Sequence, residues 1–147
     1  MTINVSKDLR VEVQIAQSNC RLPIEDAYVW ASSALENDRR TLCIRVVGES
    51  ESQELNSRFR KKEAPTNVLS FQSELVDCLG DIAICGPVAE REAVEQKKTL
   101  DDHYAHLIVH GILHLRGYDH ISDRDLKKME SKEREILAGF GITNPYE

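Results

Sequence analysis

Three histidines in the C-terminal third of the chain have the spacing of ligands to one metal ion. In the segment HLIVHGILHLRGYDH (residues 106–120), His110 and His114 are four residues apart. On one helix, such a pair projects from the same face, about one turn apart. Gly117 follows three residues later and suits the left-handed turn that ends many helices. The chain can then double back, so that His120 supplies a third ring nitrogen.

Three imidazoles with an open fourth position are typical of catalytic zinc, because structural zinc sites are closed by four ligands. The spacing therefore predicts one Zn²⁺ ion per chain, held by His110, His114 and His120. Three imidazoles also suit nickel, copper or iron, so the sequence leaves the metal used in the cell open. His103 and His106 extend the same helical stripe upstream, and we expect them to line the site or to support its ligands.

The metzincin proteases share this spacing, as HExxHxxGxxH, with one difference. Gly111 stands where those proteases have a glutamate. That glutamate takes a proton from the metal-bound water, which a glycine cannot do. The residues therefore favour a metal hydrolase of another kind, with a metalloprotease or amidase as an alternative. Asp81 is a candidate general base, and Asp119 is either a support for His120 or a solvated charge.

A basic run, RFRKK (residues 58–62), stands out in a chain of net charge −6. Arginine offers a planar fork of donors to phosphate, and lysine adds a point charge. By itself the run is also typical of a solvated helix end, where cations interact favourably with the helix dipole. Together with a metal hydrolase site, it indicates a phosphodiester substrate. The net charge argues against a nucleic-acid coat protein held by overall basic charge.

Hydrophobic periodicity predicts the elements that must position these residues. Strands are expected at about residues 9–16, 41–48, 68–74 and 79–85, the last two joined as a pair by a short turn. Helices are expected from Pro23 to Leu35 and at about residues 50–60, 88–97, 100–115 and 122–138. This order predicts an α+β fold: a small mixed, mostly parallel sheet of about four strands, flanked by helices and carrying a zincin-like metal site.

The composition fits a single globular domain over residues 1–147, with 41% hydrophobic and 30% charged residues and no repeats or linkers. No apolar run approaches the roughly 20 residues of a membrane span, and the N-terminus lacks the apolar region of a signal peptide. We therefore expect a cytoplasmic protein without a membrane partner. The four cysteines form no CxxC pair, and we expect them to be buried thiols.

The motif residues resemble the YbeY family of bacterial endoribonucleases. HGILHLRGYDH (residues 110–120) fits the family pattern HGxLHLxGYDH. LNSRFRKKEAPTNVLSF (residues 55–71) resembles the second family signature, an arginine-bearing helix end followed by PTNVLSF. LGDIAIC (residues 79–85) matches the strand that follows. The resemblance covers roughly residues 40–140.

The resemblance implies a metal-dependent endoribonuclease specific for single-stranded RNA, which acts in 3′-end maturation of 16S rRNA and in ribosome quality control. It implies that His110, His114 and His120 are the metal ligands, that His114 is needed for catalysis, and that Arg60 meets the RNA phosphate. The implied partners are RNA and the small ribosomal subunit, with a ribosomal protein as a further candidate. A non-catalytic ribosome-assembly factor is the other alternative. The attacking oxygen, the cleavage site and the oligomeric state stay open.

Overall fold

In a computed structural model, four strands and five helices are found in the described residues, which are 8–17, 20–60, 67–118 and 122–142. In chain order they are β1 (Val11–Ile15), α1 (Ile24–Leu35), β2 (Thr41–Val47), α2 (Glu49–Arg60), β3 (Val68–Gln72), β4 (Cys78–Cys85), α3 (Gly86–Glu95), α4 (Leu100–Leu115) and α5 (Asp123–Ala138). Every predicted element is present, with its ends shifted by a few residues at most. The periodicity of the sequence therefore located the elements correctly.

The four strands form one mixed sheet in the order β1-β2-β4-β3. The pairs β1–β2 and β2–β4 are parallel, whereas β3 is antiparallel to β4. The predicted fold class is thus confirmed, as is the pairing of the two strands joined by a short turn. The neighbour of β2 is β4, although β3 is the next strand along the chain. The connection from β2 through α2 therefore leads to the edge of the sheet, where β3 lies. The hairpin of β3 and β4 then places β4 between β2 and β3.

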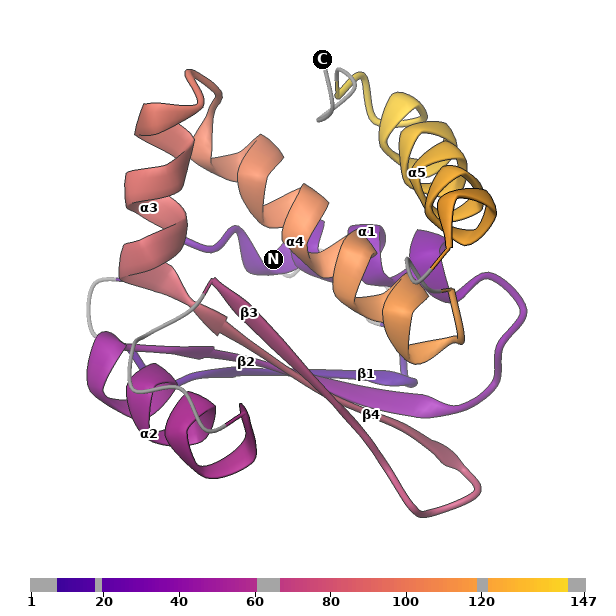
Figure 1. The fold of residues 1–147 in the computed structure, drawn as a ribbon, viewed down its shortest axis with the longest axis horizontal. Helices are drawn as coiled ribbons and strands as arrows, with labels where there is room; N and C mark the ends of the chain where they lie inside the picture. Colours follow the sequence, from indigo (N-terminus) through magenta and orange to yellow (C-terminus); the bar gives the residue numbers. More distant parts are fainter. Residues whose placement is uncertain (1–7, 18–19, 61–66, 119–121, 143–147) are drawn as a thin grey trace, which may run out of the picture.

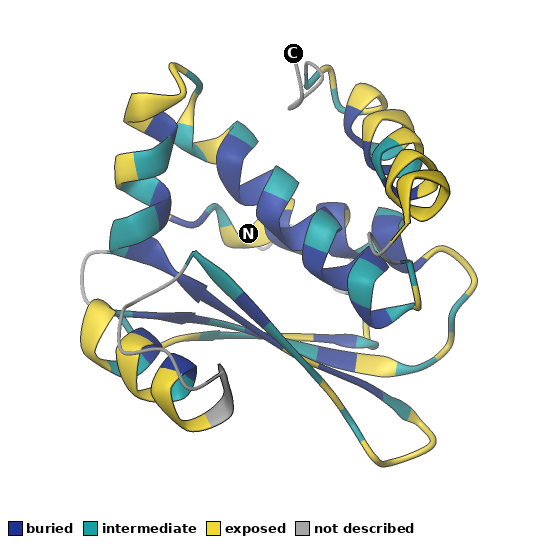
Figure 2. Cartoon of the chain, in the orientation of Figure 1, coloured by how far each residue is buried: buried dark blue, intermediate teal, exposed yellow. Residues whose placement is uncertain are grey.

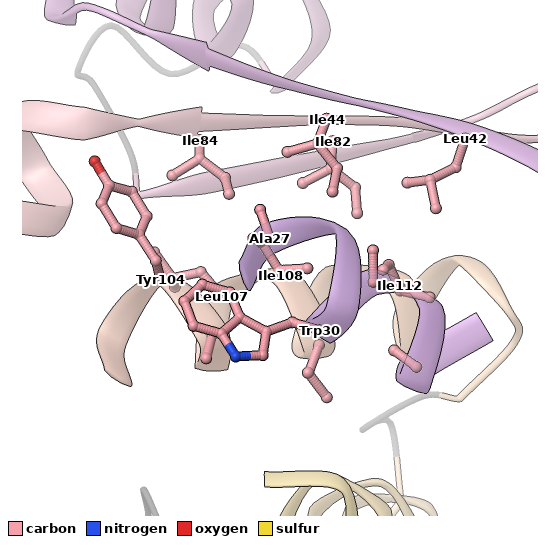
Figure 3. Close-up of a cluster of buried hydrophobic side chains, with 14 of the residues drawn as sticks. Ala27, Trp30, Leu42, Ile44, Ile82, Ile84, Tyr104, Leu107, Ile108 and Ile112 are labelled. Carbon is pink, nitrogen blue, oxygen red and sulfur yellow. The ribbon is translucent and has the colours of Figure 1, made fainter. Parts of the chain in front are cut away.

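Helices α1, α3 and α4 cover one face of the sheet, and α5 packs against α4 (Figure 1). Helix α2 lies on the other face (Figure 1). Alternate residues of β2, among them Ile44, point toward the larger group of helices and are buried. There they meet residues such as Trp30 of α1 and Ile108 of α4, which form the core shown in Figure 3. No described helix combines the length and the apolar character needed to cross a membrane.

Helix α4 runs through the middle of this helical layer and is buried along most of its length (Figure 2). The Oγ1 atom of Thr99 caps its first turn by accepting from the backbone N–H of Asp102 at 3.1 Å. At the other end, the N–H of Tyr118 donates to the Leu113 carbonyl at 2.9 Å, and Gly117 has a φ of +102°. This left-handed residue ends the helix as the sequence predicts, because a glycine has no Cβ to oppose that conformation.

Helix α5 begins at a similar cap, where the Oγ atom of Ser122 accepts from the backbone N–H of Asp125 at 3.1 Å. Most of this helix is exposed, and its buried residues are Met129, Glu133 and Leu137. They are four residues apart and therefore share the face that packs against α4. The described cysteines are all free thiols, of which Cys85 is buried and the other three are half-buried.

Candidate metal centre

Three histidines form a stripe along the one face of α4 that is not fully buried. His106, His110 and His114 are four residues apart, so their side chains leave the helix on successive turns. All three are half-buried, whereas the other residues of α4 from 103 to 115 are buried. The ring centroids of His106 and His110 are 6.0 Å apart. The structure thus brings the predicted ligands His110 and His114 together on one accessible helix face.

A carboxylate from α5 reaches this stripe. The Oε1 atom of Glu133 lies 2.8 Å from Nδ1 of His110, and its Oε2 atom lies 3.0 Å from Nε2 of His106. The side chain of Glu133 is fully buried, whereas those of His106 and His110 are 17% and 33% exposed. Ligand atoms of these three residues lie within 4.8 Å of one another, so this group could hold a metal ion.

Reasoning from the sequence did not identify Glu133 as part of the site. The segment that contains it, KKMESKERE (residues 127–135), suggests a charged, solvated helix, in which a further glutamate gives no special signal. The signal that could have found it is its spacing, because Glu133 lies four residues after Met129 and four before Leu137. A glutamate in the apolar stripe of an amphipathic helix is a buried polar residue, which calls for a partner.

His103 makes a separate contact one turn upstream. Its Nε2 atom lies 2.9 Å from Oε1 of Glu92 on α3, and Asn67 donates to the same oxygen at 3.1 Å. Burial lowers the pKa of the His103 imidazole below its usual range, although the Glu92 carboxylate opposes that shift. His103 therefore links α4 to α3 and to the residue that precedes β3, whereas His106 shares the Glu133 carboxylate with His110.

The structure does not describe the side chain of Arg60 or any part of His120. Arg60 is the last residue of α2, and its side chain is not among those described. His120 and its neighbour Asp119 also lie outside the described residues. Of the basic run, Arg58 is described: its side chain is 66% exposed, and its Nη1 atom lies 3.8 Å from Oε1 of Glu54.

The candidate base Asp81 lies on another face of the sheet. It is exposed on β4, where the adjacent Ile82 is fully buried in the core beneath α4. Successive side chains of a strand point to opposite faces. Asp81 accordingly lines a cleft of about 500 Å³ on the face that carries α2, together with residues such as Glu12 and Arg45. The structure therefore does not bring Asp81 to the histidine stripe.

Comparison with known proteins agrees with this arrangement. The family described as endoribonuclease YbeY matches residues 7–141 of the chain. The solution structure of TM1509 from Thermotoga maritima has the same fold, with a TM-score of 0.60 and 24% identity, over 93% of this chain and 95% of that one. The family match spans both sequence motifs, the histidine stripe and Glu133. The chain therefore belongs to the YbeY family of metal-dependent endoribonucleases, which process ribosomal RNA.

Proposed function

We propose that this protein is a zinc-dependent endoribonuclease that cleaves single-stranded RNA. In the cytoplasm it acts on the small ribosomal subunit, in 3′-end maturation of 16S rRNA and in ribosome quality control, with a ribosomal protein as a candidate partner. The observation that carries the proposal is the pair His110 and His114 on the accessible face of α4, in a chain of this family.

The donor set fits zinc. Imidazole nitrogen is a common zinc ligand, and His110 and His114 are positioned one helical turn apart. Because Nδ1 of His110 faces the Glu133 carboxylate, its Nε2 atom is the one that can bind a metal. His120 is proposed as the third ligand, since it follows the left-handed residue Gly117 by three positions. Three ligands leave a coordination position open for substrate.

In this mechanism His110, His114 and His120 would hold a Zn²⁺ ion, which would supply either activation of a water molecule or Lewis acidity toward a phosphate oxygen. The chain itself binds and orients the RNA. Arg60 donates its planar fork to phosphate oxygens and stabilises the negative charge that grows there in the transition state. The basic run at residues 58–62 provides a local attraction for RNA, because the net charge of −6 gives no general one.

Cleavage of a labelled single-stranded RNA, and of the same sequence in a duplex, tests the proposal. The zinc-loaded wild type should cut the single strand. His114→Ala should lose both zinc and cleavage, and metal analysis of each variant is the control. Arg60→Ala should keep its zinc and lose roughly 10²- to 10³-fold in rate, as for the loss of one transition-state donor. Arg39→Ala, which removes an exposed arginine outside the proposed site, should cut like the wild type.

Three results would contradict the proposal. Equal cleavage by the wild type, His114→Ala and Arg60→Ala would mean that the activity is not that of this site. RNA binding without any cleavage would favour the non-catalytic assembly factor. Cleavage of an unstructured protein that His114→Ala abolishes would favour the metalloprotease. The role in maturation is tested in cells whose protein carries His114→Ala, which should accumulate 16S rRNA with an unprocessed 3′ end.

A further inference from the structure

Glu133 occupies a helix position where an apolar residue is expected. It stands between Met129 and Leu137 on the face of α5 that packs against α4, and those two residues are 1% and 0% exposed. Glu133 is also 0% exposed. Charged side chains are almost never fully buried unless they are paired, because burial of an isolated carboxylate is very costly. The polar contacts of Glu133 must therefore compensate for the free-energy cost of burying its carboxylate.

Both carboxylate oxygens of Glu133 meet ring nitrogens of α4. Oε1 lies 2.8 Å from Nδ1 of His110, and Oε2 lies 3.0 Å from Nε2 of His106. An ionised carboxylate has only acceptor positions, so each ring nitrogen must donate its N–H. These are hydrogen bonds to a charged acceptor, which are shorter and stronger than those between neutral groups. One buried side chain thus fixes the orientation of two imidazoles.

The hydrogen bond to Glu133 also selects the tautomer of His110. A neutral imidazole carries one hydrogen, and donation to the Glu133 carboxylate at 2.8 Å requires that this hydrogen be on Nδ1. In this tautomer Nε2 is the ring nitrogen with the lone pair that a metal ligand needs. With the hydrogen on Nε2 instead, that nitrogen could not bind a metal until the hydrogen had moved. Metal-binding histidines commonly donate their other ring N–H to a carboxylate, which orients the ring and raises its basicity.

We infer that Glu133 is a positioning residue of the metal centre, which holds His110 in the tautomer and orientation that present Nε2 to the ion. This inference rests on the proposed function, because it takes His110 as a ligand. Glu133 itself acts through His110 and does not touch the substrate. His106 supports this role. It donates to the other oxygen of Glu133 and so holds the carboxylate in place.

The geometry separates this role from direct ligation by Glu133. Atoms bound to one tetrahedral zinc at about 2.0–2.2 Å lie roughly 3.3 Å or more apart. The contacts of Glu133 with His106 and His110 measure 3.0 and 2.8 Å, which are hydrogen-bond lengths. In addition, the His110 nitrogen that faces Glu133 is already the donor of such a bond. The distances therefore favour a hydrogen-bonded support over a ligand.

Zinc affinity of the full chain, measured by competition with a chelator, tests the inference without RNA. Glu133→Gln keeps the shape of the side chain and an acceptor for His110, but removes the charge. We expect it to weaken zinc binding about 10- to 100-fold, the usual effect of losing such a partner. Glu135→Gln is the matched control, since Glu135 carries the same charge on the same helix and is 71% exposed. It should bind zinc like the wild type.

Two further measurements keep a folding defect apart from a positioning role. Thermal unfolding without metal should show that Glu133→Gln is folded, with a transition close to that of the wild type. In the wild type itself, nitrogen NMR shifts of the metal-free imidazoles report which ring nitrogen of His110 carries the hydrogen. The hydrogen is expected on Nδ1, and finding it on Nε2 would overturn the inference even if the glutamine variant did not fold.

The affinities decide between the remaining outcomes. Unchanged zinc affinity in Glu133→Gln would overturn the positioning role. So would complete loss of zinc in both Glu133→Gln and His106→Asn, to the extent seen in His114→Ala, because this pattern would make Glu133 and His106 ligands. A wild type that binds zinc as expected but cleaves no RNA would contradict the proposed function and leave this inference intact.

Discussion

A Cβ atom built on Gly111 of α4 would lie 3.0 Å from the Cδ1 atom of Ile82 on β4. The Oγ atom of Ser70 on β3 would be 3.3 Å away, so both strands approach the helix at this residue. Gly111 is buried in the contact between α4 and the sheet. The residue that stands in place of the metzincin glutamate therefore serves close packing, and this helix position has no room for the missing base.

A glutamate at position 111 should destabilise the protein strongly. Gly111→Glu would force a charged side chain into that contact, and we expect the free energy of unfolding to fall by about 3 kcal/mol or more. Urea unfolding measures the change. Gly48→Glu is the matched control, because a Cβ atom there meets nothing within 4 Å, and its cost should stay below about 1 kcal/mol. Equal stabilities of the two variants, or a gain of peptidase activity, would contradict the packing role.

Gly117 should matter both for stability and for the metal. Its φ of +102° is unfavourable for any residue with a Cβ atom, so Gly117→Ala should cost about 1–3 kcal/mol. Zinc affinity should also fall, since Gly117 comes three residues before the proposed ligand His120. Gly139→Ala provides the comparison, because Gly139 also ends a helix but has a right-handed φ of −61°. Urea unfolding and chelator competition on both variants check this, and similar losses in the two would argue against it.

The free energy of unfolding should decrease at acidic pH, in part because the Asp38 carboxylate becomes protonated. The Arg40 guanidinium donates to both of its oxygens, at 3.0 and 2.7 Å, and lowers the pKa of Asp38 to about 2. Since the pKa is lower in the folded state, the contribution is complete above the unfolded value near 4 and is lost as the pH falls toward 2. Asp38→Asn should therefore be less stable than the wild type at pH 6, by about 1–2 kcal/mol after solvent screening.

Urea unfolding at several pH values tests the direction of this pH dependence. The stability gap between the wild type and Asp38→Asn should narrow between pH 4 and pH 2. A gap that stays constant over that range would show that the carboxylate charge of Asp38 contributes nothing.

Asp81 should be dispensable as a general base. It faces the cleft beside α2, whereas the histidines lie on a helix that covers the other face of the sheet. Loss of a true general base costs roughly 10²- to 10⁴-fold in rate. Asp81→Asn should lose far less than this in the RNA cleavage assay, with KM compared separately from kcat. A fall in kcat within that range would show that Asp81 acts at the reacting phosphate.

The sequence by itself determined the helices and strands, and it determined that His110 and His114 lie on the same helix face. Thr99, Gly117 and the apolar repeat between them define α4 through contacts within a few residues. Given that helix, its pitch alone puts His110 and His114 on one face. The pairing of β3 with β4 was likewise predictable, because a short turn joins the two strands.

Only the tertiary structure decided the strand order and the role of Glu133. The neighbour of β2 is β4, because a hairpin places the later strand at the centre, and strand pairing over such distances is not encoded in local periodicity. Glu133 is 23 residues from His110 in the sequence. Their contact exists because α5 packs its buried stripe against α4, and the burial of a carboxylate depends on partners that come from another element.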